Sequence, residues 1–241
     1  MSLRRAHPPR AALRLPPGGF ALPASVLLAS VFLLPATARA QAATPEHGMH
    51  QRHADPAAYI ASLEDPARDA YQKPDEVLKA LDLKPGEVVA DIGAGSGYFT
   101  LRFARAVGER GRVYAVDVSP DMVRHLNRRL RDAGVRNVVT VLSDPDDPLL
   151  PDASVDRVVI VDTWHHIEDQ PGYLALLKRV LRPGGQVVHV DFHKRDLPVG
   201  PPVGMKIARE DLVKQMETAG FRLAAEHSFL PYQYFLVFAV P

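Results

Sequence analysis

Hydrophobic residues after residue 74 fall into two alternating patterns. Continuous apolar runs, of the length expected for buried strands, occupy residues 87–93, 112–119, 137–144, 155–163 and 186–192. Segments with apolar residues at helical spacing, opened by Pro or closed by Gly, lie at residues 98–108, 119–134, 171–185 and 209–220. This alternation predicts parallel strands joined by helices that cover both faces of one sheet.

Two further apolar runs follow, at residues 221–230 and 233–240. Only Pro231 and Tyr232 separate them, which is too short for a helical crossover, so the two runs must pair antiparallel. We therefore predict an α/β fold, a doubly wound and mostly parallel seven-stranded sheet that ends in an antiparallel hairpin.

The polar pattern before residue 74 predicts a separate extension. Residues 41–56 hold few apolar residues, as is typical of a linker. Asp-Pro pairs supply a cap and a first-turn proline for short helices at 56–63 and 66–71, and a third helix is expected at 74–81. We expect residues 41–73 to form a linker with a helical extension and residues 74–241 to form one domain.

Residues 1–40 have the layout of a secretory signal peptide. An Arg-rich start precedes the apolar run 24–34, and an A-x-A pattern ends at Ala40. The run is too short to span a bilayer as a helix, so no stable membrane anchor is expected. The signal predicts a periplasmic or secreted protein, whereas a true start at Met49 would make it cytoplasmic.

Composition narrows the classes of partner and site. The 241 residues include no cysteine, so disulfides, thiolate nucleophiles and Cys-ligated metals are excluded. The formal net charge is +1, but residues 1–40 carry +5, so the remaining residues carry −4. A mildly acidic body gives no electrostatic reason to expect a nucleic-acid partner. The sequence does not indicate an oligomeric state.

The stretch DIGAGSG, which begins at Asp91, ends the first predicted strand with a glycine turn. Gly93 permits a sharp exit from the strand, and Gly95 and Gly97 let a ligand lie against bare backbone. Dinucleotide-binding turns have the spacing G-x-G-x-x-G, but here the spacing is G-x-G-x-G and Tyr98 stands where the third glycine would fall. Asp91 would repel a pyrophosphate, yet it can accept hydrogen bonds from an ammonium group.

Two more acidic residues follow the next two predicted strands. Asp117, at the end of the second strand, can accept two hydrogen bonds from a ribose diol. Asp144, at the end of the third, is placed to accept from an adenine amino group, with Asp146 and Asp147 as competing candidates. The ligand expected from these sites has an amino acid end, a ribose and an adenine but no phosphate, and S-adenosylmethionine fits that description.

With these residues in place, the sequence resembles the class I S-adenosylmethionine-dependent methyltransferases, in particular those of ubiquinone and menaquinone biosynthesis. The matching stretches are VVADIGAGSGYFTLRFA, VYAVDVSPDMV, LPDASVDRVVIVDTWHHIED and YLALLKRVLRPGGQVVHVDF. The resemblance implies a Rossmann-like fold and methyl transfer from S-adenosylmethionine to a small-molecule acceptor. It also implies that Asp91, Gly93, Gly95 and Gly97 line the methionine part of the cofactor, Asp117 its ribose and Asp144 its adenine end.

The same resemblance implies that the N-terminal extension covers the cofactor as a lid. Tyr71 and Gln72 are then the residues expected to contact the ligand, although helix-to-domain packing accounts for them equally well. The loop DLPVGPPVG, residues 196–204, is expected to face the substrate.

Candidate catalytic groups lie at the ends of two predicted strands: Asp162, His165 and His166 at the fourth, and Asp191 and His193 at the fifth. One imidazole can act as a base or contact the substrate. The pair can also belong to a metal site that takes Asp162 or His193 as a third ligand. Alternatively, one histidine caps a short helix near Glu168 and the other is half-buried. We predict His165 and His166 as catalytic residues and no metal.

Two other functions compete with methyl transfer. A nicotinamide-dependent reductase is disfavoured by the glycine spacing and by the antiparallel ending. An exported, non-catalytic protein that binds S-adenosylmethionine or a nucleoside is a stronger alternative, because the cofactor is made in the cytoplasm and a chain threaded unfolded across a membrane would arrive without it.

Overall fold

The computed structural model describes residues 55–240. The predicted signal peptide and most of the predicted linker lie outside these residues. Within the described part of the chain, no helix is both long and apolar enough to cross a membrane.

The helices begin and end close to their predicted limits. The α-helices are α1 (Pro56–Leu63), α2 (Asp69–Gln72), α3 (Pro74–Leu81), α4 (Thr100–Val107), α5 (Pro120–Asp132), α6 (Gln170–Val180) and α7 (Arg209–Thr218), and the 3-10 turns are η1 (Pro66–Arg68), η2 (Trp164–His166) and η3 (Val203–Met205). Asp55 and Asp65 accept hydrogen bonds from the first turns of α1 and η1, as their Asp-Pro pairs predict. Ser119 caps α5 in the same way.

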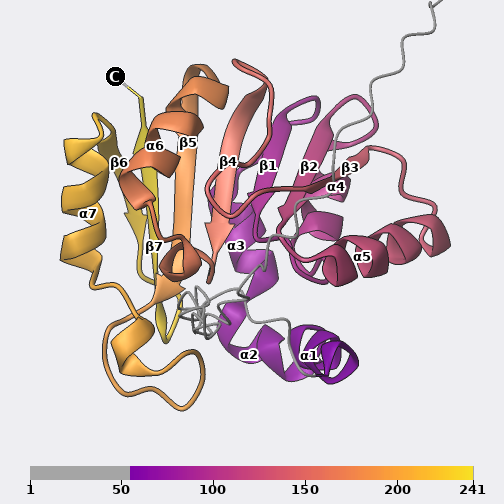
Figure 1. The fold of residues 1–241 in the computed structure, drawn as a ribbon, viewed down its shortest axis with the longest axis horizontal. Helices are drawn as coiled ribbons and strands as arrows, with labels where there is room; N and C mark the ends of the chain where they lie inside the picture. The colour runs from indigo at the N-terminus through magenta and orange to yellow at the C-terminus, as the bar shows by residue number, and fades with distance from the viewer. Residues whose placement is uncertain (1–54, 241) are drawn as a thin grey trace, which may run out of the picture. The chain divides into compact units, whose positions relative to one another are not determined.

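The strands form one sheet with the order β3-β2-β1-β4-β5-β7-β6 (Figure 1). They are β1 (Val88–Ile92), β2 (Arg112–Asp117), β3 (Val138–Leu142), β4 (Val155–Val161), β5 (Leu181–Phe192), β6 (Arg222–His227) and β7 (Gln233–Ala239). The first five are parallel, and β7 pairs antiparallel with both β5 and β6. The predicted fold class is confirmed. The strand order reverses between β1 and β4, which is where ligands bind in such sheets.

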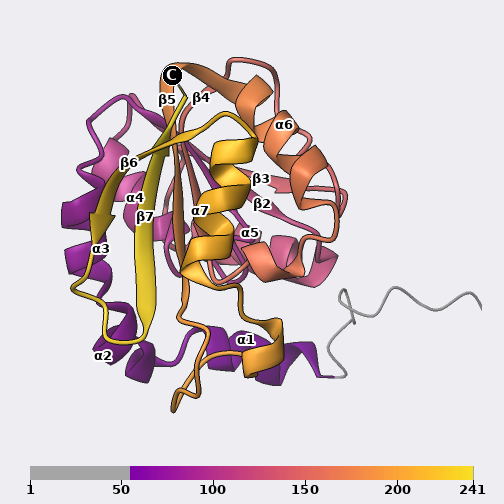
Figure 2. The same cartoon turned by 90° about the vertical axis from the view of Figure 1, so that its left-hand side faces the viewer.

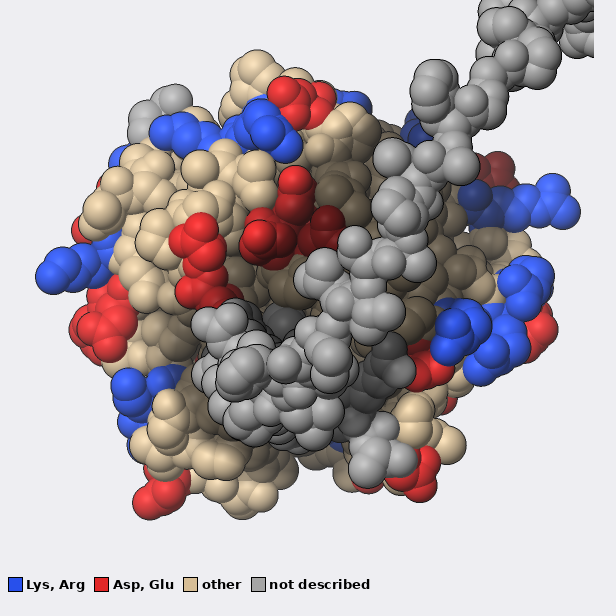
Figure 3. Space-filling view, in the orientation of Figure 1, with Lys and Arg blue, Asp and Glu red and all other residues tan. Residues whose placement is uncertain are grey.

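Helices cover both faces of the sheet (Figure 2). Helices α3 and α4 pack on one face, where Val77 and Phe103 are fully buried against residues of β1 and β4. Helices α6 and α7 pack on the other face, through Leu177 and Leu212. The short helices α1 and α2 lie beyond the carboxyl ends of the parallel strands, at the bottom of Figure 1. Basic and acidic side chains are interspersed over the face seen in Figure 3.

Two boundaries differ from the sequence-based expectation. Helix α6 ends at Val180 and β5 already begins at Leu181, although a helix was expected as far as residue 185. The strand register jumps from Leu181 to Gln186, so the intervening Pro-Gly-Gly residues bulge out of the ladder. The last hairpin has a longer loop than expected, because β6 ends at His227 while β7 begins at Gln233.

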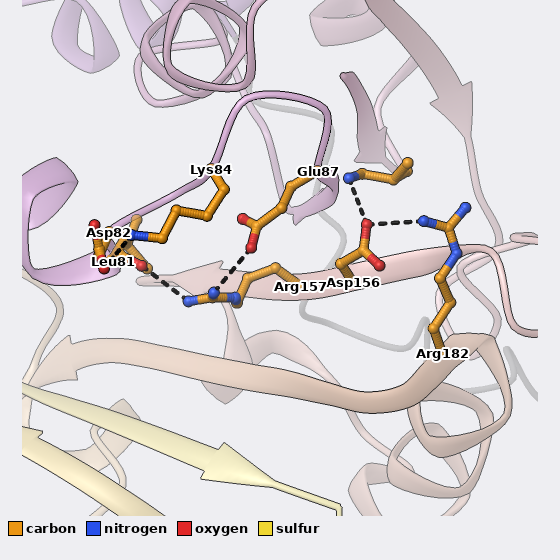
Figure 4. Close-up of polar contacts among 8 residues, drawn as sticks. Leu81, Asp82, Lys84, Glu87, Asp156, Arg157 and Arg182 are labelled. Atoms are coloured by element: carbon orange, nitrogen blue, oxygen red, sulfur yellow. Dashed lines mark hydrogen bonds and ion pairs between the residues drawn. The ribbon is translucent and has the colours of Figure 1, made fainter. Parts of the chain in front are cut away.

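The amino ends of the strands are held by a polar network (Figure 4). Arg157 of β4 donates to the Leu81 carbonyl at the end of α3 over 2.9 Å and pairs with Glu87 at 3.4 Å. Asp156 accepts from the Val88 main-chain N–H at 2.7 Å. These contacts fix β1, β4 and α3 at the edge opposite the carboxyl ends.

Candidate functional site

A cavity of about 880 Å³ opens at the carboxyl ends of β1, β2 and β4. The glycine turn after β1 forms part of its wall, the residues after β2 and β3 another part, and those after β4 a third. Residues of α1 and η1 contribute a further side, and residues 200–205 contribute to the wall as well. We call residues 56–72, which comprise α1, η1 and α2, the lid.

The three glycines of the turn have different roles. All three have positive φ values, +73° for Gly93, +55° for Gly95 and +87° for Gly97, which L side chains rarely adopt. Gly93 and Gly95 line the cavity. Gly97 does not line the cavity. It faces α5 instead, where an added Cβ would meet the Leu126 Cδ1 at 2.3 Å. Gly97 therefore allows α5 to pack closely, and the expectation that it faces a ligand is not met.

Asp91 is 3 % exposed at the end of β1 and lines the cavity. Its Oδ2 accepts a hydrogen bond from the Thr100 hydroxyl of α4 at 2.5 Å. Burial raises the pKa of its carboxyl to about 7, against the lowering effect of the Thr100 hydroxyl. No cation among the described residues contributes to this balance. A ligand cation placed beside Asp91 would therefore pair with the carboxylate without competition from a neighbouring lysine or arginine.

Asp117 ties the glycine turn to the end of β2. Its Oδ2 accepts from the Gly95 N–H and its Oδ1 from the Ser119 N–H, both at 2.8 Å. Burial nevertheless raises the pKa of its carboxyl. Each oxygen keeps a lone pair for a further donor, and Asp117 lines the cavity. The carboxylate is thus oriented for a bidentate contact with a diol.

Asp144 lines the cavity after β3. Its two competitors, Asp146 and Asp147, do not line it. Asp147 instead accepts from the Leu149 N–H at 2.7 Å. The geometry favours Asp144 as the acidic group at this end of the cavity.

The lid contacts the cavity through residues other than those expected. Tyr59, Leu63 and Arg68 line it. Tyr71 does not line it, since its ring lies 6.0 Å from that of Phe192. Gln72 does not line it either. It is 1 % exposed, and its Nε2 donates to the Gln233 side chain at 3.4 Å. For Tyr71 and Gln72 the structure shows helix-to-domain packing, which the sequence had left open.

Charged contacts fasten the lid to the domain. Glu64 accepts from Arg129 of α5 at 2.9 Å, and its Oε1 lies 2.6 Å from the His125 Nε2. The guanidinium groups of Arg68 and Arg102 both lie over the Tyr98 ring, 4.4 Å and 4.3 Å from its centroid. The lid therefore rests on both α4 and α5.

His165 and His166 lie side by side on η2 with ring centroids 4.2 Å apart, and both line the cavity. The His165 Nδ1 lies 3.4 Å from the Asp191 Oδ2. Burial alone would lower the pKa of His165, but the hydrogen bond and charge of Asp191, with the charge of Asp162, raise it. Neither histidine caps the next helix, because Asp169 does so by accepting from the Gly172 N–H.

Asp162 directly follows β4 and has a left-handed backbone, with φ +51°. Burial and the nearby Asp191 charge raise the pKa of its carboxyl to about 7. Its buried Oδ1 has no hydrogen-bond partner among residues 55–240. His193, the other candidate third ligand, does not line the cavity. Trp164 is fully buried and donates to the Gln215 side chain at 3.3 Å, so it is a packing residue.

Several cavity residues have no sequence motif that announces them. Tyr59 and Arg68 come from the lid, and Thr163 packs against Gly93, where an added Cβ would meet its Oγ1 at 2.2 Å. Gly200 and Pro201 also line the cavity, from the loop that was expected to face a substrate. The closeness of Thr163 is the physical reason for a glycine at position 93.

The donor set fits S-adenosylmethionine. Asp91 offers a buried carboxylate for an ammonium group, and Arg68 on the opposite lid offers a cation for a carboxylate. Asp117 and Asp144 extend the acidic wall in the direction of β2 and β3. Gly95 leaves room beside Leu63, whose Cδ1 a Cβ there would approach to 3.2 Å.

Comparisons with known proteins point the same way. A family model described as a methyltransferase domain matches residues 89–185. The ubiquinone/menaquinone biosynthesis C-methyltransferase UbiE of Vibrio vulnificus is 35% identical over 121 residues, which are 50% of this chain and 45% of that protein. The chain thus spans about half the length of the curated relatives that it matches.

Solved structures extend the likeness over more of the chain. A methyltransferase from Aquifex aeolicus, dependent on S-adenosylmethionine, is 30% identical with a TM-score of 0.74, and the match covers 78% of this chain and 99% of that one. An arsenic(III) methyltransferase from Chlamydomonas reinhardtii, 22% identical with a TM-score of 0.53 over 65% of this chain and 64% of that one, shares the fold. By its sequence, fold and cofactor pocket, the chain belongs to the class I methyltransferases whose cofactor is S-adenosylmethionine.

Proposed function

We propose that the protein transfers a methyl group from S-adenosylmethionine to a small-molecule acceptor. The observation that carries the proposal is the continuity of one cavity, which runs from Asp91 and Asp117 to His165 and His166 under the lid. A cofactor held at the first pair of residues would have its reactive end directed at the second.

In this proposal, different residues of the cavity bind the cofactor and the acceptor. Asp91 and Arg68 hold the two charged ends of the amino acid part, and Asp117 holds the ribose. When bound, the cofactor supplies an activated methyl group on a sulfonium. His165 and His166 orient the acceptor, and an imidazole there can take a proton from an acceptor that must lose one. The lid excludes water while reactant atoms are held in line.

The size and surroundings of the cavity support a small acceptor. Beyond the cofactor residues, its wall includes Ile167, Tyr173 and Met205, which offer apolar contact. Interspersed charges on the face in Figure 3 give a polyanion no continuous basic track there. The relatives named for ubiquinone and menaquinone biosynthesis make a reduced quinone the first acceptor to test.

Calorimetry with the purified full chain tests the cofactor assignment. We expect S-adenosylmethionine to bind, and Gly95→Val or Asp117→Ala to weaken it by at least about tenfold, since the first adds a β-branched residue at positive φ and the second removes the oriented carboxylate. Asp146→Ala, outside the cavity, is the matched control. Absence of binding by the unchanged protein would refute the assignment.

Turnover separates the competing functions. Incubation with methyl-labelled cofactor and a panel of quinols, phenols and amines should give a labelled product and stoichiometric S-adenosylhomocysteine. Binding without either product across the panel would favour the non-catalytic alternative. Binding of a reduced nicotinamide dinucleotide in place of S-adenosylmethionine would favour the reductase.

We also propose that the chain is exported, on the basis of the basic, apolar and A-x-A segments within residues 1–40. Fractionation of host cells with determination of the mature N-terminal residue tests this. A mature chain that begins at Gln41 in the periplasmic or secreted fraction is expected. A cytoplasmic chain that begins at Met49 would contradict the proposal.

A further inference from the structure

Three potential metal ligands converge where β4 and β5 end, beside the cavity. They are an Asp162 oxygen, a His165 ring nitrogen and an Asp191 oxygen, all within 4.8 Å of one another. His165 and Asp191 are buried, and Asp162 and His165 line the cavity. We propose that Asp162, His165 and Asp191 bind a divalent first-row transition ion, such as Mn²⁺ or Zn²⁺.

The sheet register brings the two carboxylates together. Val161 of β4 pairs with Val190 of β5, and the Asp162 N–H donates to the Val190 carbonyl at 2.8 Å. Asp162 and Asp191 are therefore neighbours across adjacent parallel strands. The left-handed backbone of Asp162 turns the chain at once into η2, which carries His165. A non-glycine residue in this conformation is uncommon, although Asp adopts it more readily than most residues do.

The spacing of the ligand atoms suits a metal better than a strong hydrogen bond. Charge-assisted N–H···O bonds are usually about 2.7–2.9 Å long, whereas the His165 Nδ1 and the Asp191 Oδ2 are 3.4 Å apart. Ligands bound at about 2.1 Å in a tetrahedron lie roughly 3.4 Å from each other. A small inward movement of the Asp162 carboxylate would complete the set.

One carboxylate oxygen of the cluster is buried without a hydrogen-bond partner among the described residues. This oxygen is the Asp162 Oδ1. The nearby cations direct their hydrogen bonds elsewhere, since Arg68 donates to the Leu63 carbonyl and Lys206 to the Arg195 carbonyl. Two close ionised carboxylates without a directly paired lysine or arginine repel each other, and a bound cation would relieve that repulsion.

Neighbouring contacts support the ligands. The Asp191 Oδ1 accepts from the Phe192 N–H at 2.7 Å, which leaves the Oδ2 for the metal. Two carboxylates with one imidazole favour an ion that accepts both oxygen and nitrogen, and disfavour Mg²⁺, which prefers oxygen alone. Since three protein ligands leave at least one coordination position open, the ion can hold a further oxygen ligand on the cavity side.

Metal titration of the full chain, without cofactor and after treatment with a chelator, tests the proposal. Calorimetry and equilibrium dialysis with Zn²⁺ and with Mn²⁺ should show one saturable site that Mg²⁺ does not occupy at the same concentration. Asp162→Asn, which keeps the side-chain shape, and His165→Gln, which removes the imidazole ligand, should each weaken binding by at least about tenfold. Each ion should also raise the melting temperature of the unchanged protein and not that of these variants.

Two controls separate this site from other histidines. The triple change His47→Ala, His50→Ala and His53→Ala removes three closely spaced histidines outside the described residues, and His193→Ala removes one outside the cavity. Both should bind the ion as the unchanged protein does. Loss of binding in the triple variant, equal binding by Asp162→Asn, or no binding by the unchanged protein would each overturn the proposal and leave a proton on His165 as the charge that the carboxylates share. Because S-adenosylmethionine binding is measured separately, failure here leaves the proposed function intact.

Discussion

The buried carboxyl of Asp91 holds a proton up to nearly neutral pH, because burial raises its pKa to about 7. An ammonium group beside it would favour the ionised form and lower that pKa. Below pH 7 the ammonium itself keeps its proton. Cofactor binding at pH 6 should therefore release roughly one proton, and affinity should rise up to about tenfold per pH unit until the pH passes 7. Calorimetry in buffers of different ionisation enthalpy measures the released protons.

The source of that proton can be assigned with two variants. Thr100→Val removes the hydroxyl that lowers the Asp91 pKa, so the rise in affinity should extend to higher pH. Asp162→Asn should leave the proton release unchanged, although the pKa of Asp162 is also raised to about 7. Proton release that disappears in Asp162→Asn would show that Asp91 is not its source.

Burial also shifts the pKa of His189, a residue of β5 in the hydrophobic core, but it lowers this pKa instead of raising it. Its ring is fully buried, lies 5.1 Å from the Trp164 ring, and has no hydrogen-bond partner on either nitrogen among the described residues. Burial lowers its pKa to about 3. Between pH 6.5 and 3 the unfolded chain therefore binds the proton and the folded chain does not, so stability falls as the pH falls, by up to about 1.4 kcal/mol per unit.

Replacement of His189 by leucine should remove this loss of stability at low pH. His189→Leu should raise the free energy of unfolding by about 1–3 kcal/mol at pH 5, with a smaller gain at pH 8, where the histidine is neutral in both states. Denaturant unfolding at the two pH values measures the difference. An equal gain at both would mean that packing, not the proton, is responsible.

At the scale of elements, the sequence predicts well what local chemistry decides. Asp55 and Asp65 predict the starts of α1 and η1, because the capping side chain and the proline after it both act within the first turn. The boundary between α6 and β5 could not be read in this way. Leu181 is apolar and follows a helical pattern, and only its pairing with Val155 makes it the first residue of a strand.

The lid is held by contacts that join elements far apart in sequence, and Glu64 is the centre of one of them. It pairs with His125 and Arg129, all partly exposed, so each pair contributes about 0.5–1 kcal/mol. Glu64→Gln should loosen the lid and speed cofactor release roughly two- to tenfold. Stopped-flow displacement measures the rate. Glu76→Gln, which breaks an exposed pair with Lys73 in α3, should leave it unchanged. Equal rates in all three proteins would mean that the lid does not retain the ligand.

At the scale of the whole molecule, the sequence identified Asp91, Asp117 and Asp144 as cavity residues because each lies at or just beyond the end of a strand that the fold brings to one edge. It missed Asp121, which lines the cavity from α5. It could not separate Gly97 from Gly93 and Gly95, since the difference is made by Leu126, which lies on α5. The sequence also could not show that Tyr59 and Arg68, and not Tyr71 and Gln72, are the lid residues that line the cavity. Their roles depend on how the lid crosses the sheet edge, which no local pattern encodes.

The two edges of the sheet carry separate tasks, and Asp156 tests that separation. Its Oδ2 accepts from Val88 at 2.7 Å and from Arg182 at 2.8 Å, at the amino ends of the strands (Figure 4). Asp156→Ala should lower the free energy of unfolding by about 1–2 kcal/mol, mostly through the lost main-chain bond, because the ion pair is partly exposed. Asp152→Ala, which breaks an exposed pair with Arg179, should cost at most about 0.5 kcal/mol. Cofactor affinity of both folded variants should stay unchanged, since the network lies at the edge opposite the cavity. Weaker cofactor binding by Asp156→Ala alone would show instead that the amino-end network sets the position of β1 and hence the glycine turn.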